Sequence, residues 1–117
     1  MSEKKTVLII DDDKSVREFL HDLLRLSGFK SYSADNGISA LSLLKKRHFD
    51  IIITDCSMPG MNGIELVKII SPQYPHTLII GMSGNCDEKD FLSAGANAFL
   101  AKPFRPDDLL LLFQAKH

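Results

Sequence analysis

Three short apolar runs constrain the fold of this chain more than any other feature. They are "TVLII" (6–10), "DIIITD" (50–55) and "TLIIGMS" (77–83). Their apolar residues are mostly β-branched, and they do not alternate with polar residues. Such runs are typical of strands that are buried on both faces, which requires a sheet with a covering layer on each side.

Segments with helical periodicity lie between these runs. After the first run, apolar residues recur at helical spacing at Val16, Phe19, Leu20, Leu23 and Leu24. Asp13 is predicted to cap the start of this helix, and Gly28 is predicted to end it. The other predicted elements are strands at 30–34 and 98–102, and helices at 36–47, 62–70, 87–95 and 105–116.

Strands and helices therefore alternate along the chain. This pattern predicts an α/β fold, with a doubly wound, five-stranded parallel sheet flanked by five helices. A chain of 117 residues has the size of one domain, so we expect a single domain over 1–117. In such folds ligands bind beyond the carboxyl ends of the strands, so the residues after each strand are the candidates for a site.

Composition excludes several classes of function. The formal net charge is −1, which provides no basic field, and we expect no direct nucleic-acid binding. The apolar runs are too short to span a bilayer and none forms a signal peptide, so we expect a cytoplasmic protein that does not associate with membranes. The chain has two cysteines, Cys56 and Cys86, which is too few for a disulfide scaffold, and we expect free thiols.

Charged and hydroxyl side chains follow the predicted strands. Asp11 and Asp12 come after the first strand, Asp55 ends the third, Ser83 ends the fourth and Lys102 ends the fifth. Three carboxylates at one edge would repel one another unless a cation lay among them. Carboxylate oxygens are ligands that Mg²⁺ prefers, with Mn²⁺ as a substitute, and a lysine can pair with an anion. The sequence therefore predicts a divalent-cation site that accepts a phosphoryl group.

Four stretches together indicate a family. "IIDDD", "IIITDCSMPGMNG", "MSG" and "AKPF" resemble the receiver domains of response regulators in two-component signalling, and the resemblance covers nearly the whole chain. It implies a flavodoxin-like fold with strand order 2-1-3-4-5. It also implies a signalling domain that turns over no external substrate, whose partners are a sensor histidine kinase or a histidine phosphotransfer protein and an output protein. A dimer linked to phosphorylation is compatible with it.

The resemblance also implies roles for the acidic residues. Asp55 would be the phosphoacceptor, which takes the phosphoryl group of a phosphohistidine. Asp12 would bind Mg²⁺ directly, Asp11 would hold it through water, and Asp55 and the backbone carbonyl of Ser57 would complete the protein ligands. A carboxylate is a competent nucleophile for this chemistry, and positioning and charge neutralisation account for most of the catalysis. Without the metal, at least one carboxyl pKa should rise.

The remaining implied roles concern the phosphoryl group and the switch. Ser83, with Gly84 after it, would hydrogen-bond the phosphoryl oxygens, and Lys102 would pair with them. Phe99 would be the aromatic switch that packs inward when Ser83 moves. The Lys102–Pro103 peptide bond would be cis.

The chain departs from the family pattern in three places. The segment 83–95 is shorter by about one helical turn, which predicts a shortened fourth helix and puts the usual output surface in doubt. The switch position holds Phe99, which lacks the tyrosine hydroxyl. Cys56 and Cys86 both lie on loops at the active edge, which leaves a redox-sensitive pair as the alternative to free thiols. Cytosolic thiols are normally reduced, which favours free thiols.

Two other functions compete with the receiver interpretation. A haloacid-dehalogenase-like phosphatase also places an aspartate nucleophile and Mg²⁺ after its first strand, but residues 11–15 fit its motif poorly. A pseudo-receiver that binds partners without phosphate is favoured only by the shortened fourth helix.

The four histidines lie away from the strand ends and are expected at the surface. They are His21, His48, His76 and His117. The phosphoryl donor should therefore be another protein.

Overall fold

The computed structural model describes residues 4–114 of the chain, and strands and helices alternate along them. The elements are β1 (Thr6–Ile10), α1 (Lys14–Leu26), β2 (Lys30–Ala34), α2 (Gly37–Lys46), β3 (Ile51–Asp55), α3 (Gly63–Ile70), β4 (Leu78–Ser83), α4 (Glu88–Ala94), β5 (Ala98–Ala101) and α5 (Pro106–Gln114). The predicted alternation is confirmed. The last two positions of the predicted helix 105–116 lie outside the described residues.

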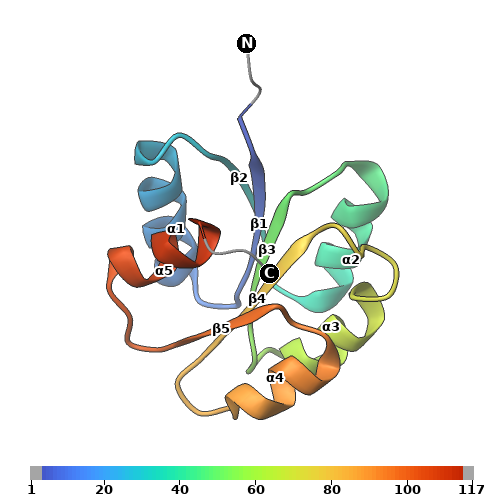
Figure 1. Cartoon of the computed structure of the whole chain (residues 1–117). Helices are drawn as coiled ribbons and strands as arrows, with labels where there is room; N and C mark the ends of the chain where they lie inside the picture. The colour runs from blue at the N-terminus through green and yellow to red at the C-terminus, as the bar shows by residue number, and fades with distance from the viewer. Residues whose placement is uncertain (1–3, 115–117) are drawn as a thin grey trace.

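The five strands form one parallel sheet in the order β2-β1-β3-β4-β5, as expected (Figure 1). The register pairs Ile10 with Thr54, Asp55 with Met82, and Ser83 with Ala101. The carboxyl ends of four strands are therefore aligned along one edge. The winding reverses between β1 and β3, and the crevice at such a reversal is where doubly wound sheets bind ligands.

Each face of the sheet carries its own hydrophobic core. Helices α1 and α5 cover one face, and α2, α3 and α4 cover the other (Figure 1). Along β1, Val7 and Ile9 pack toward α1 and α5, whereas Leu8 and Ile10 pack toward the opposite helices. Both sets are fully buried because strand side chains alternate between two covered faces. This explains why the strand sequences lack polar alternation.

Side-chain caps set where the helices begin. Asp13 accepts a hydrogen bond from the backbone of Ser15 at the start of α1, as predicted, and Asn36 caps α2 in the same way. Asn62 and Glu65 form a reciprocal capping box at the start of α3. These caps satisfy backbone N–H groups that have no partner within the helix. They hold the loops at the carboxyl edge of the sheet close to the helices that follow.

Helix α4 is short, as the sequence predicted. It has 7 residues and ends at Gly95, whose φ of 119° is in the left-handed region that favours glycine. Phe91 anchors it in the core, and its ring lies where a side chain at Gly81 of β4 would project. The contact requires a residue without a Cβ at Gly81. The shortened segment is thus fastened to the sheet by one large aromatic side chain.

The histidines that the structure describes lie away from the acidic edge, which is the carboxyl edge of the sheet with Asp11, Asp12 and Asp55. His48 and His76 are exposed as expected, and His21 lies at the surface as well, although it is partly buried against Ser31. It lies on the side of α1 that faces β2, which the periodicity of α1 alone did not reveal. His117 lies outside the described residues. Within residues 4–114 no helix is long and apolar enough to cross a membrane.

Candidate functional site

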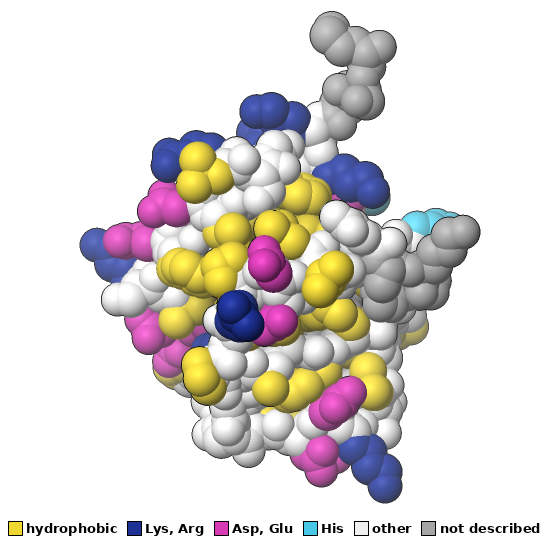
Figure 2. Space-filling view, turned by 60° about the vertical axis from the view of Figure 1, so that its left-hand side comes forward, with side chains coloured by type: hydrophobic (Ala, Val, Ile, Leu, Met, Phe, Trp, Pro, Cys, Tyr) yellow, Lys and Arg dark blue, Asp and Glu magenta, His cyan; other side chains and the backbone are white. Residues whose placement is uncertain are grey.

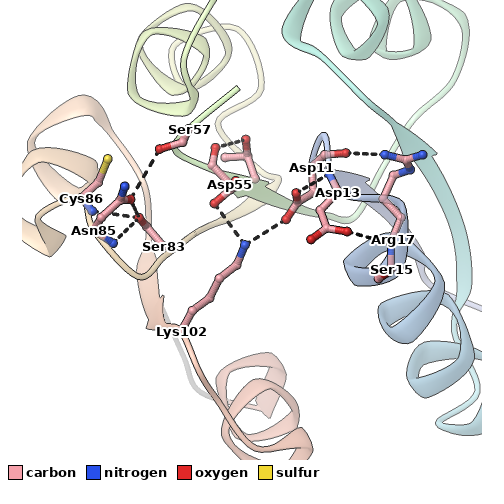
Figure 3. A network of polar contacts seen from close by, with 11 residues as sticks. Asp11, Asp13, Ser15, Arg17, Asp55, Ser57, Ser83, Asn85, Cys86 and Lys102 are labelled. Carbon is pink, nitrogen blue, oxygen red and sulfur yellow. Dashed lines mark hydrogen bonds and ion pairs between the residues drawn. The ribbon is translucent and has the colours of Figure 1, made fainter. Parts of the chain in front are cut away.

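Charged side chains from three strand ends meet at the carboxyl edge of the sheet (Figure 3). Lys102 Nζ lies 3.1 Å from Oδ2 of Asp11 and 3.3 Å from Oδ1 of Asp55. Asp11 is 1% exposed and Asp55 is 8% exposed. Removing two carboxylates from water is costly unless a cation compensates them. In this structure the ammonium of Lys102 lies between them and provides that compensation.

Burial and neighbouring charges shift the pKa of two groups in the site, Asp55 and Lys102. Burial raises the pKa of Asp55 above its ordinary value, and the negative charge of Asp11 raises it further. Lys102 and the backbone N–H of Cys56 offset only part of this increase. Burial lowers the pKa of Lys102, but its hydrogen bonds and charge interactions with Asp11 and Asp55 outweigh burial, so the net direction is upward. The prediction that one carboxyl pKa rises without a metal is confirmed.

The carboxylates are also arranged for a metal ion. One oxygen each from Asp11, Asp12 and Asp55 lies within 4.8 Å of the other two. Asp12 is exposed, so a cation can reach the group from solvent. Hard carboxylate oxygens with open positions for water suit Mg²⁺ or Mn²⁺. The donor set therefore fits the expected metal. The role of the Ser57 carbonyl as a further ligand stays a prediction.

Arg17 supports Asp11 in a way that the sequence did not indicate. Its Nη1 donates a hydrogen bond of 2.8 Å to the backbone carbonyl of Asp11. The backbone N–H of Asp13 donates to Oδ1 of Asp11 at 2.9 Å. The first contact holds the backbone and the second orients the carboxylate, so that Oδ2 points at Lys102. An arginine in the first turns of a helix has no sequence signature for this task.

Ser83 belongs to a separate hydrogen-bond network. Its Oγ accepts from the backbone N–H groups of Asn85 at 3.1 Å and Cys86 at 2.8 Å, and it donates to Oδ1 of Asn85 at 3.0 Å. The hydroxyl of Ser57 also donates to Oδ1 of Asn85, at 3.4 Å. The hydroxyl of Ser83 is therefore engaged by its own loop, and Lys102 and the carboxylates form a distinct group in Figure 3.

The remaining predicted residues lie around β5. Phe99 is half-buried and packs against the ring of Phe91, with ring centroids 5.8 Å apart. Its role as a switch stays a prediction. Gly84 leaves space beside the Lys102 backbone, since an added Cβ would approach its carbonyl oxygen at 3.5 Å. The Lys102–Pro103 peptide bond is cis, the isomer that the resemblance implied.

Cys56 and Cys86 are joined by a disulfide bond, so the expectation of free thiols was wrong. Their Cα atoms are 6.3 Å apart, within the usual range for disulfides. The two residues are 30 positions apart in sequence, and a count of cysteines says nothing of their separation in space. They meet because β3 and β4 are paired neighbours, and each cysteine lies just beyond the end of one of these strands.

The surface beside Lys102 is apolar. Val16 and Phe19 of α1 line a groove with Lys102, Pro103 and Phe104. Phe19 is 45% exposed, and its ring lies 6.3 Å from that of Phe104. Figure 2 views the molecule from the side of α1 and α5 and shows hydrophobic side chains gathered there among charged ones. A partner that approached Asp55 from this side would find both charge and apolar surface.

Comparisons with known proteins agree with this geometry. The sequence profile of the "Response regulator receiver domain" family matches residues 7–114. Chemotaxis protein CheY-3 of Vibrio cholerae is 34% identical over 110 residues, which cover 89% of this chain and 85% of that protein. Response regulator protein FleR of Pseudomonas aeruginosa is 37% identical over 114 residues, which cover 95% of this chain but 24% of FleR. The chain thus corresponds to one part of that longer relative.

A solved structure shares the same architecture. The chemotaxis response regulator CheY4 of Vibrio cholerae superposes with a TM-score of 0.88 at 33% identity. The match covers 96% of this chain and 98% of that structure. The order of the strands, the acidic edge and the family match lead to one conclusion. The chain belongs to the response regulator receiver domains of two-component signalling.

Proposed function

We propose that this receiver domain accepts a phosphoryl group on Asp55 from the phosphohistidine of a partner protein. The observation that carries the proposal is the contact of Asp55 with Lys102, at 3.3 Å, beside the carboxylates of Asp11 and Asp12. An anion-pairing lysine, a nucleophilic oxygen and a metal-ligand set at one strand edge are the parts that phosphoryl transfer requires.

The reaction would proceed by in-line displacement. A carboxylate oxygen of Asp55 forms a bond to phosphorus while the bond from phosphorus to the imidazole nitrogen of the donor breaks. The nitrogen keeps the electron pair of that bond. Lys102 pairs with the negative charge of the phosphoryl oxygens. Mg²⁺, held by Asp11, Asp12, Asp55 and the carbonyl of Ser57, would add positive charge there. Hydrolysis of the acyl phosphate by water would reset the domain, without turnover of an external substrate.

Phosphorylation would then change the surface through Ser83. Its hydroxyl, now bound by Asn85 and Cys86, would turn to donate to a phosphoryl oxygen. Gly84 adds no side chain that would obstruct this turn. Phe99, half-buried on the adjacent strand, would pack further inward and alter the surface beside α4. The phosphoryl group thus biases an equilibrium between two arrangements that both exist without it.

The partners follow from this chemistry. The donor is a sensor histidine kinase or a histidine phosphotransfer protein in the cytoplasm, and the recipient of the signal is an output protein or a second copy in a phosphorylation-linked dimer. The apolar groove of Val16, Phe19 and Phe104 flanks Lys102, where a donor must come close to reach Asp55. The domain itself would bind no nucleic acid. The family match and the acidic edge do not favour a phosphatase or a pseudo-receiver.

Intact-mass spectrometry after incubation with acetyl phosphate and Mg²⁺ tests the proposal. We expect wild type to gain one phosphoryl group, and to gain none without Mg²⁺. Asp55→Asn should gain none under any condition. Asp107→Asn removes the same charge from an exposed position on α5 and is the matched control, which should behave as wild type. A gain in Asp55→Asn equal to that of wild type would contradict the assignment of Asp55.

A further inference from the structure

The disulfide joins two loops that both serve the candidate site. Cys56 directly follows Asp55, and Cys86 lies three positions after Ser83. We call residues 84–87, between β4 and α4, the switch loop. The disulfide therefore fastens the switch loop to the first residue beyond the phosphoacceptor.

This cross-link constrains the loops more than the sheet. Strands β3 and β4 are already paired in register from Ile51 and Leu78 to Asp55 and Met82. Both cysteines lie beyond the last paired residues, so the sheet needs no covalent link to bring them together. What the bond adds is a fixed position for the backbone of Cys86.

The backbone of Cys86 in turn holds Ser83. Its N–H donates the shortest of the hydrogen bonds to Oγ of Ser83, at 2.8 Å. Asn85 completes the arrangement, because it binds the hydroxyls of both Ser83 and Ser57 through one side-chain oxygen. With the disulfide closed, the switch loop is tied to the opposite loop at Cys56 and Ser57, and the hydroxyl of Ser83 stays on its own loop.

The two sulfur positions differ in access. Cys56 is 3% exposed and belongs to the core, whereas Cys86 is half-buried at its margin. A thiol reagent that approaches from solvent meets Cys86 first. In a reducing compartment such as the one proposed for this domain, a disulfide is usually transient and serves catalysis or redox sensing.

We propose that Cys56 and Cys86 form a reversible thiol–disulfide site, and that closure of the disulfide slows phosphorylation of Asp55. The inference rests on the proposed phosphoacceptor function. In the oxidised form the switch loop holds Ser83 away from the phosphoryl group. In the reduced form the loop is released, and Ser83 can stabilise the acyl phosphate.

The redox step is thiol–disulfide exchange with a small dithiol. A thiolate of the dithiol attacks Sγ of Cys86, the bond between the cysteines breaks, and Sγ of Cys56 leaves as a thiolate that takes up a proton. The second thiol of the dithiol then releases Cys86 from the mixed disulfide. The protein gains two electrons and two protons, and the dithiol becomes a cyclic disulfide. A low-molecular-weight disulfide reverses the change and leaves two free thiols of its own.

The test compares oxidised and reduced protein under identical conditions. Oxidised glutathione closes the disulfide and dithiothreitol opens it, and alkylation with iodoacetamide followed by intact mass counts the free thiols. Each form is then incubated with acetyl phosphate and Mg²⁺. We expect the reduced form to gain the phosphoryl group about tenfold faster, within the range usual for coupling between two sites. Cys86→Ser and Cys56→Ala, which cannot close the bond, should phosphorylate at the rate of the reduced form with either reagent.

Each other outcome has a definite meaning. Equal rates for the two wild-type forms, or a faster oxidised form, overturn the redox inference and leave the phosphoacceptor proposal standing. A protein whose thiols stay free in oxidised glutathione overturns it as well. If neither the reduced form nor either variant is phosphorylated, the phosphoacceptor proposal fails, and the redox inference fails with it. A response of the variants to dithiothreitol would assign the effect to the reagent and overturn the role of the pair.

Discussion

The ammonium nitrogen of Lys102 lies 3.3 Å from Oδ1 of Asp55, although 47 positions separate the two residues. The contact joins the loop after β5 to the end of β3. It places a positive charge where a metal ion and a phosphoryl group would each act on the same carboxylate.

Replacing Lys102 should therefore have two opposite effects. Lys102→Ala removes a cation that competes for the carboxylates, so the affinity for Mg²⁺ should rise about tenfold, given the strength of charge interactions at such distances. Phosphorylation should slow about a hundredfold, because one group that stabilises the transferred charge is lost. Calorimetric titration with Mg²⁺ measures the first effect, and intact mass with acetyl phosphate measures the second. Lys89→Ala removes the same charge from exposed α4 and should change neither.

Mg²⁺ should stabilise the fold through the same carboxylates. A ligand at a hundred times its Kd adds about 2.7 kcal/mol to the free energy of unfolding. The melting temperature of the protein should rise when MgCl₂ is added, but not when NaCl is added at equal ionic strength. Asp12→Ala should lose most of this response, and without metal it should be at least as stable as wild type, since Asp12 is exposed and repels two neighbours. A full Mg²⁺ response in Asp12→Ala would contradict the ligand assignment.

The disulfide should contribute measurably to stability. It closes a loop of 30 positions, for which the chain-entropy estimate is roughly 3 to 4 kcal/mol. Urea unfolding of wild type with and without dithiothreitol should show a loss of this size. Cys86→Ser should unfold at the same urea concentration under both conditions. Superimposable wild-type curves would mean that the bond restrains the unfolded chain very little.

His21 should make stability depend on pH near neutrality. Burial and the charge of Arg17 lower the pKa of His21 below 6.5, and Asp22 opposes them only in part. The unfolded chain therefore binds this proton at a higher pH than the folded protein does. The contribution of His21 to the free energy of unfolding is therefore fully present above pH 6.5. It is lost as the pH falls from 6.5 toward the lower pKa that His21 has in the folded protein.

Urea unfolding across roughly pH 5 to 8, where histidine ordinarily titrates, measures this dependence. His21→Gln should flatten the decline, whereas His76→Gln, at an exposed position, should leave it in place. If His21→Gln lost as much stability at low pH as wild type does, the pH dependence would belong to another group.

Gly63 should be intolerant of a side chain. A Cβ at this position would collide with the backbone carbonyl of Asp55, and the N–H of Gly63 donates to the carbonyl of Cys56 at 2.8 Å. Gly63→Ala should cost about 1 to 3 kcal/mol, as overpacking usually does, and slow phosphorylation by shifting Asp55. Gly84→Ala is the control for stability alone, since its Cβ would make ordinary contacts. Equal stability of the two variants would show that the loop after β3 can shift to make room for the added methyl group at little cost.

The elements of the fold could be predicted because their signals are local. The uninterrupted apolar run of β3 indicates a strand buried on both faces, and Asp13 and Asn36 cap helices through contacts with their own neighbours in sequence. The gathering of Asp11, Asp55 and Lys102 follows from one topological rule, since parallel strands end at the same edge. The short α4 could be predicted because segment 83–95 is shorter than the corresponding segment of the receiver family.

The sequence by itself therefore determined which residues form the elements and which charges meet at the acidic edge. Only the tertiary structure decided that Cys56 bonds to Cys86, that Arg17 holds the carbonyl of Asp11, and that Ser83 is bound by its own loop. The physical reason is that these contacts depend on the paths of loops beyond the strands. A loop path is set by packing between distant segments, whereas periodicity and capping act within one or two turns of the chain.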